Sequence, residues 1–273
     1  MAQTTSIPEF DRPPVSEVAL SIEFSPLEKW RASDALSYGK LLQSDYPLME
    51  IRRALPSQIE KFGEETWQQL SFRVEIGNPD ATRFWFLADP SNWLIQIQQD
   101  RFIINWRKVT GTEIYPRYLS SLRPRFEQEW QRYRNFVVER GAGVIDVKQV
   151  EVTYVNDVLR GEGWQTFPEA LALFTVLSAG SANQFLPPLE TLTMAGSYLL
   201  PEERGRLRFS ANHALRQFDN KEMIQMRLSV RGRPLSSLDA DLLKWMDMGR
   251  EWVVRGFTDL TSSKAHAIWG RTR

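Results

Sequence analysis

The chain has 273 residues, long for one domain and short for two independent ones, and 42% of them are hydrophobic, which is ample for a packed core. Lysine plus arginine equals aspartate plus glutamate at 34 each, so the net charge gives no reason to expect non-specific binding to nucleic acid or to an anionic membrane. The absence of cysteine excludes disulfides and thiolate metal sites, and it fits a cytosolic protein.

The first residues are polar and rich in proline. Residues 1–14 have no basic segment followed by an apolar run, so we expect no signal peptide and predict an N-terminal arm, either flexible or pinned. No stretch approaches about 18 consecutive apolar residues, the length that predicts a membrane span. The chain is therefore expected to be soluble and cytoplasmic.

Strict alternation of apolar residues from Val18 to Phe24 predicts the first strand. Ser25-Pro26-Leu27 is typical of a helix start, and a loop with two prolines follows it. Further strands are predicted near residues 67–76, 82–88, 92–99 and 101–109, the last two joined as a hairpin. A helix over 117–139 follows, with Pro124 in a fresh first turn and Gly141 as its C-cap.

The second half repeats this order. A strand at 144–157 leads to a helix near 167–178 with Thr166 as its N-cap. Strands are predicted near 189–200, 204–212 and 222–232. A helix at 238–256, capped by Ser236 and Asp239, precedes a short helix at 262–269 that Ser262 or Ser263 would start.

The element order is thus β-α-β(3–4)-α, twice, which predicts a single α+β domain at 15–273 with half-repeats at about 15–141 and 144–273. Its antiparallel sheet would carry the helices at 117–139 and 238–256 on one face. This is an architecture of the helix-grip or TATA-binding-protein-like saddle kind. That comparison rests on element order and carries no function.

Several short segments together resemble one known family. They include Asn105-Trp106-Arg107, Tyr115-Pro116-Arg117-Tyr118 and Phe257-Thr258-Asp259-Leu260-Thr261. The chain resembles, over nearly its whole length, a sporadically distributed bacterial family of conserved hypothetical proteins of about 270 residues. The resemblance implies a bacterial origin, and it supplies no activity, cofactor or catalytic residue.

The tract from Arg101 to Tyr118 holds the first candidate site. Arg101, Arg107 and Arg117 are candidates for an anion-binding cluster, because guanidinium groups match carboxylate and phosphate, and Trp106 could offer a stacking plane. The alternative is that Trp106 belongs to the core and the arginines pair with carboxylates. Tyr115 and Tyr118 flank a proline turn, where they would either brace a corner or contact a ligand.

Two segments concentrate basic charge although the total is balanced. Residues 101–140 hold nine basic and four acidic residues, and residues 204–233, with Arg206 and Arg208, hold eight basic and two acidic. Such strands could follow a phosphate backbone, or their arginines could be ordinary solvated decoration.

Catalytic and metal signatures are absent from the sequence. The two histidines, His213 and His266, lack paired spacing, so no zinc site is predicted. His266 near Trp269 could be an acid–base group or a structural residue. The Phe257–Thr261 segment would cap the last helix or bind a ligand.

We therefore expect a binding protein without an evident active site, metal or cofactor. The leading partner is another protein or a second copy of the chain. The alternatives are a nucleic-acid-binding or defence-associated protein that uses the basic strands, and an enzyme or sensor for a small anionic ligand. The expected recognition residues are Arg101, Trp106, Arg107, Tyr115, Arg117, Tyr118, Arg206, Arg208 and His266.

Overall fold

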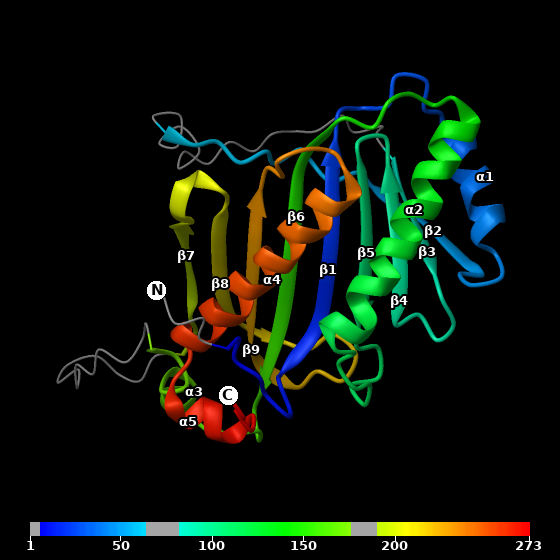
Figure 1. The fold of residues 1–273 in the computed structure, drawn as a ribbon. Helices are drawn as coiled ribbons and strands as arrows, with labels where there is room; N and C mark the ends of the chain where they lie inside the picture. The colour runs from blue at the N-terminus through cyan, green and yellow to red at the C-terminus, as the bar shows by residue number, and fades with distance from the viewer. Residues whose placement is uncertain (1–5, 64–81, 176–189) are drawn as a thin grey trace.

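A computed structural model describes residues 6–63, 82–175 and 190–273. Within them lies one antiparallel sheet of nine strands in the order β2-β3-β4-β5-β1-β6-β9-β8-β7 (Figure 1). The strands are β1 (Val15–Phe24), β2 (Leu48–Arg53), β3 (Thr82–Leu87), β4 (Trp93–Gln98), β5 (Arg101–Arg107), β6 (Val147–Leu159), β7 (Thr193–Leu199), β8 (Arg206–Leu215) and β9 (Glu222–Gly232). The helices are α1 (Ala32–Leu42), η2 (Tyr118–Leu122, a π-helical turn), α2 (Arg123–Arg140), α3 (Phe167–Leu171), η4 (Pro201–Glu203, a 3-10 turn), α4 (Asp239–Leu260) and α5 (Ser263–Ile268).

The long helices α2 and α4 lie across the same face of the sheet (Figure 1). Alternation along β1 and β5 turns apolar side chains to this face, and aromatic rings fill the space below α2. Tyr133 lies 5.1 Å from Phe102 and 6.1 Å from Phe24, measured between ring centroids. Trp130 donates a 3.0 Å hydrogen bond to Asp239 at the start of α4, which ties the two helices together.

Most predicted elements are confirmed. The alternation from Val18 to Phe24 forms β1, and β4 and β5 form the predicted hairpin. Pro124 lies in the first turn of α2, and Gly141 ends that helix with a left-handed φ of 59°. Thr166 caps α3.

Several boundaries differ from the prediction. The helix start at Ser25-Pro26-Leu27 was wrong, because Leu27 donates its N–H to Gln99 and α1 begins only at Ala32. The loop after it contains β2, an edge strand that the sequence did not indicate. Helix α3 ends at Leu171, and α4 continues to Leu260.

Other predictions differ in detail or fall outside the structure. Ser236 hydrogen-bonds to Asp241 rather than acting with Asp239, and Leu238 is the N-cap of α4. The strand predicted near 67–76 lies outside the described residues. Ser262 caps α5 as predicted, accepting a hydrogen bond from the N–H of Ala265.

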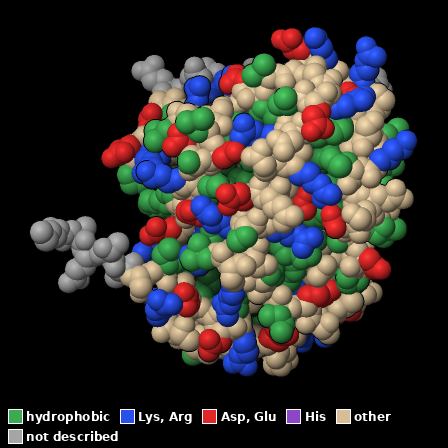
Figure 2. Space-filling model, turned by 45° about the vertical axis from the view of Figure 1, so that its right-hand side comes forward, with side chains coloured by type: hydrophobic (Ala, Val, Ile, Leu, Met, Phe, Trp, Pro, Cys, Tyr) green, Lys and Arg blue, Asp and Glu red, His purple; other side chains and the backbone are tan. Residues whose placement is uncertain are grey.

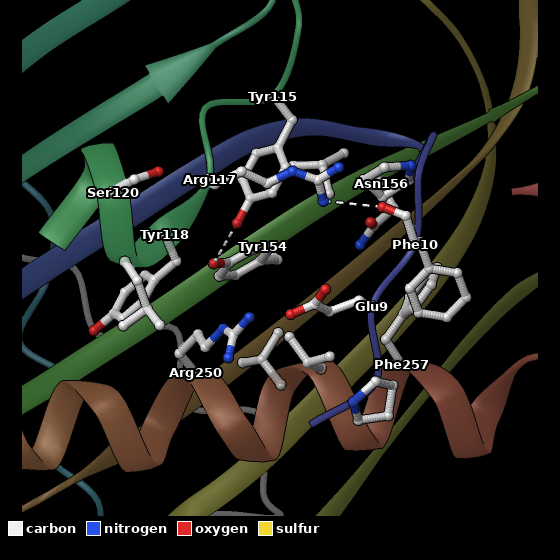
Figure 3. Close-up of a pocket in the computed structure, with 16 residues that line it drawn as sticks. Glu9, Phe10, Tyr115, Arg117, Tyr118, Ser120, Tyr154, Asn156, Arg250 and Phe257 are labelled. Carbon is white, nitrogen blue, oxygen red and sulfur yellow. Dashed lines mark hydrogen bonds between the residues drawn. The ribbon is translucent and has the colours of Figure 1, made fainter. Parts of the chain in front are cut away.

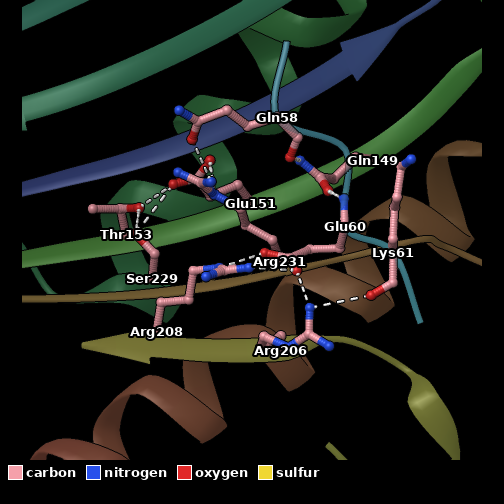
Figure 4. A network of polar contacts seen from close by, with 10 residues as sticks. All are labelled: Gln58, Glu60, Lys61, Gln149, Glu151, Thr153, Arg206, Arg208, Ser229 and Arg231. Carbon is pink, nitrogen blue, oxygen red and sulfur yellow. Dashed lines mark hydrogen bonds and ion pairs between the residues drawn. The ribbon is translucent and has the colours of Figure 1, made fainter. Parts of the chain in front are cut away.

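A polar segment crosses the opposite face of the sheet. This strap, residues 54–63, follows β2 and reaches β8 (Figure 4). Gln98 accepts the N–H of Leu55, and Gln149 accepts the N–H of Glu60 at 2.8 Å. Polar side chains on this face are thereby buried and hydrogen-bonded, which is the condition for burying polar groups at low cost.

The described helices include none that is both long enough and apolar enough to cross a membrane.

Candidate functional site

The N-terminal arm, here residues 6–14, is pinned by the end of the chain. The N–H of Asp11 donates a 2.9 Å hydrogen bond to the carbonyl of Gly270, and Phe10 and Arg271 form an antiparallel bridge. Of the two alternatives that the sequence left open, the contacts of residues 6–14 favour the pinned one.

Phe10 anchors the arm in an aromatic pocket. Its side chain is only 5% exposed. The ring centroids of Phe257 and His266 each lie 5.6 Å away, and that of Trp269 lies at 6.5 Å, all in edge-to-face arrangements. Such contacts add to the burial of apolar area, so Phe10 is the main attachment point of the arm.

Arg117 binds the arm through its main chain. Its Nη1 donates a 2.9 Å hydrogen bond to the carbonyl of Phe10 (Figure 3). Its Nη2 donates one of 3.4 Å to the carbonyl of Asp11. The guanidinium also lies 6.0 Å from the Tyr115 ring centroid. Because these bonds go to backbone atoms, they would be available to any extended segment.

The loop before Tyr115 is held by Glu113. Its carboxylate accepts the backbone N–H groups of Val109, Thr110 and Gly111 at 2.9–3.0 Å. Burial opposes ionisation, yet these bonds outweigh it and lower the pKa of Glu113 to about 2. The loop is thereby fixed directly before the turn that presents Tyr115 and Arg117.

A cavity of about 340 Å³ lies beside the arm. One wall is the arm itself, a second is the Tyr115–Ser120 turn and a third is α4, while Tyr154 and Asn156 of β6 contribute to the floor (Figure 3). A second hollow of about 400 Å³ lies along residues 11–14. We call the surface that holds residues 8–13, together with these hollows, the arm groove.

Arg250 is an unpaired cation in this cavity. It extends from α4, its buried Nε has no hydrogen-bond partner among the described residues, and its guanidinium lies 5.6 Å from the Tyr118 ring centroid. Arg250 was not among the residues predicted for the site. A signal existed, since Arg250 interrupts an apolar stripe with Val253, Val254 and Phe257 at helical spacing.

Two tyrosine hydroxyls meet at the cavity floor. The Oη atoms of Tyr115 and Tyr154 lie 3.0 Å apart. Burial raises the pKa of both phenols, so both keep their protons at neutral pH. Two protons serve one hydrogen bond between them, which leaves one O–H free to donate elsewhere.

Several residues predicted for the site lie together around the arm groove. Tyr115, Arg117 and Tyr118 line the cavity, and His266 packs on Phe10. Trp106 is 2% exposed and lies beneath Tyr115 at a centroid distance of 6.0 Å, so it belongs to the core rather than to a stacking surface.

The predicted cluster of Arg101, Arg107 and Arg117 does not form. Alternation places Arg101 and Arg107 on the sheet face away from the helices, whereas Arg117 binds the arm. Arg101 pairs with Glu23 at 2.6 Å. Arg107 donates to the Ser91 carbonyl at 3.1 Å.

Arg206 and Arg208 also lie on the far face, where both pair with Glu60 of the strap (Figure 4). The Glu60 carboxylate is 2% exposed and accepts the Arg208 Nε at 2.7 Å. The structure therefore places these two arginines in a polar network around buried Glu60, apart from the arm groove, with Arg206 buried and Arg208 partly exposed.

His266 is a neutral hydrogen-bonding residue. Its Nδ1 lies 3.3 Å from Arg271 Nη1, which can only donate, so Nε2 carries the proton and donates to the Thr258 carbonyl at 3.1 Å. Burial and the Arg271 charge lower the His266 pKa. Among the described residues there is no group of three or more histidines and carboxylates that could hold a metal ion.

Positive and negative side chains are interspersed on the face that Figure 2 shows, without one large patch of either sign. Comparison with known proteins adds no assignment: no protein family, no curated protein and no solved structure matches the chain. The function must therefore be argued from the arm groove.

Proposed function

We propose that this protein is a non-enzymatic binding protein that recognises an extended segment of a protein partner in the arm groove. The observation that carries the proposal is the grip of Arg117 on two successive arm carbonyls, next to the buried ring of Phe10. Main-chain bonds supply affinity for an extended peptide, and a side-chain pocket supplies specificity. The arm occupies the groove until a partner segment displaces it.

Competition by the arm gives a direct test. Full-length Phe10→Ala should release the arm and bind a fluorescent peptide of residues 6–14, measured by anisotropy. Wild-type protein should bind it at least about tenfold more weakly, because a tethered arm competes at high effective concentration. Val144→Ala, at a residue 84% exposed, is the control and should behave as wild type.

A peptide with alanine in place of Phe10 completes the test and should not bind the Phe10→Ala protein. The proposal fails if that protein binds neither peptide, or binds both equally. A second copy of the chain is a possible source of the partner segment, and size-exclusion chromatography of Phe10→Ala would reveal arm exchange as a dimer.

The nucleic-acid alternative gains no support from Arg206 and Arg208, because Glu60 pairs with both. The proposal retains a cytoplasmic bacterial protein of the family that the chain resembles.

We also infer that the two halves are pseudo-repeats arranged as a saddle of the TATA-binding-protein kind. The strand order supports this inference, because β1 and β6 are central and each is followed outward by the last strand of its own half, β5 or β9. Equivalent ion pairs between neighbouring strands support it too. Glu23 of β1 pairs with Arg101 of β5 in the first half, and Glu151 of β6 pairs with Arg231 of β9 in the second. A sequence alignment of many relatives would test whether these pairs vary together.

A further inference from the structure

We propose that the cavity beside the arm binds a small carboxylate with an apolar body. This site goes beyond peptide recognition, because the cavity of about 340 Å³ is a part of the arm groove that the arm bounds but does not fill. Small-molecule pockets begin at about 300 Å³, so a ligand of modest size would fit.

The charge of the cavity selects an anion. The buried Nε of Arg250 has no hydrogen-bond partner among the described residues, and its guanidinium has no ion pair there. Leaving the buried Nε–H unpaired is costly although Arg250 as a whole is partly exposed, and a planar guanidinium matches a carboxylate with two parallel hydrogen bonds. Arg117, the other arginine of the cavity, already binds the arm carbonyls.

A second donor lies on the cavity floor. The Tyr115–Tyr154 pair has one hydroxyl proton that their mutual bond does not use. A carboxylate between Arg250 and this pair would accept from both.

The remaining surface suits an apolar ligand body. Val253, Val254 and Phe257 form one wall from α4, and Val15 of β1 also lines the cavity. Burial of apolar ligand surface against these side chains would add affinity that a bare carboxylate lacks.

A single negative charge fits better than two. Figure 3 shows the carboxylate of Glu9 directed from the arm into the cavity. The same carboxylate pairs with Arg273 at 2.7 Å. It would repel a dianion, and one unpaired arginine balances one charge. A carboxylate therefore fits the cavity better than a phosphate does.

The test uses the full chain and four probes. 3-Phenylpropionate, 3-phenylpropionamide, acetate and inorganic phosphate are each added up to about 10 mM, and binding is measured by thermal shift and calorimetry. 3-Phenylpropionate should stabilise the protein, and the neutral amide should bind at least about tenfold more weakly, since it loses the charged pair. Acetate should bind more weakly as well.

Variants locate the binding site. Arg250→Gln should abolish the shift, Arg250→Lys and Tyr154→Phe should weaken it, and Glu9→Gln should strengthen it by removing a like charge. Arg227→Gln, an exposed arginine on the other sheet face, is the control and should bind as wild type. Because each shift is referred to the same variant without ligand, altered stability of a variant does not confuse the result.

Four outcomes would overturn the proposal: no shift with any probe, equal shifts with acid and amide, a larger shift with phosphate, or a full shift in a folded Arg250 variant. None of these measurements uses a peptide. Failure of the carboxylate site is therefore distinguishable from failure of peptide recognition, which the anisotropy assay tests separately.

Discussion

Arg117 donates a 2.9 Å hydrogen bond to the carbonyl oxygen of Phe10, a residue 107 positions earlier in the chain. We expect Arg117→Ala to loosen the arm and to lower the free energy of unfolding by about 1.5–3 kcal/mol, the contribution of a hydrogen bond that involves a charged group. Hydrogen exchange of the Asp11 amide should accelerate at least tenfold. Arg227→Ala should leave it unchanged, and equal protection in both variants would refute the role of Arg117.

Glu60 neutralises two arginines on the polar face of the sheet. Arg206 is 5% exposed at its side chain, so Glu60→Gln would leave a buried charge without its partner. Loss of one partner of a buried ion pair costs about 3–5 kcal/mol, which urea denaturation would measure. Glu50→Gln breaks an exposed pair with Arg52 and should cost less than about 1 kcal/mol. If Glu60→Gln and Glu50→Gln lowered the free energy of unfolding by similar amounts, the buried network would be contradicted.

His266 should make stability dependent on pH. Burial and Arg271 lower its pKa below the ordinary value of 6.5, so the unfolded state binds the proton more tightly. Stability is therefore unaffected above about pH 6.5 and falls as pH decreases from there through the folded pKa. The stability advantage of wild type over His266→Gln should shrink between pH 7.5 and pH 5. A constant difference across that range would rule out this titration.

Glu113 should make stability dependent on pH in a more acidic range than His266 does. Its pKa of about 2 lies below the ordinary 4.5, so its contribution is present above pH 4.5 and is lost as pH falls toward 2. Glu113→Gln should speed hydrogen exchange at Val109, Thr110 and Gly111 at neutral pH. Glu127→Gln on α2 is the control. Unchanged exchange in Glu113→Gln would mean that the loop is held by other contacts.

The sequence predicted the elements whose pattern is local. Alternation in β1 and the helical spacing of α2 reflect burial on one face, which is visible in a short window. β2 was missed because nearly all of its side chains are exposed, so an edge strand of this kind has no apolar alternation to detect. Pro26 led to the wrong prediction of a helix start, because proline also occurs in irregular turns. Here the N–H of Leu27 donates to the carbonyl of Gln99 instead of entering a helix.

The candidate site depended on contacts between distant segments. Tyr115, Arg117, Tyr118 and His266, four of the predicted recognition residues, lie around one groove, which the arm occupies. Arg101 and Arg107 were grouped with Arg117 because they are close in sequence, yet strand alternation sends them to the other face. Arg250 could have been found only by asking why a charge interrupts an apolar helix stripe.

The strap has a consequence for how the protein unfolds. It hydrogen-bonds Gln98 of β4 through Leu55, and it binds Arg206 and Arg208 of β8 through Glu60, so it spans strands on both sides of the central β1–β6 pair. If the strands on one side of the β1–β6 pair unfolded alone, the strands on the other side would lose their hydrogen bonds to the strap. The buried charge of Glu60 or Arg206 would then be left without its partner. The nine strands should therefore lose their structure in one cooperative step, seen as a single calorimetric transition.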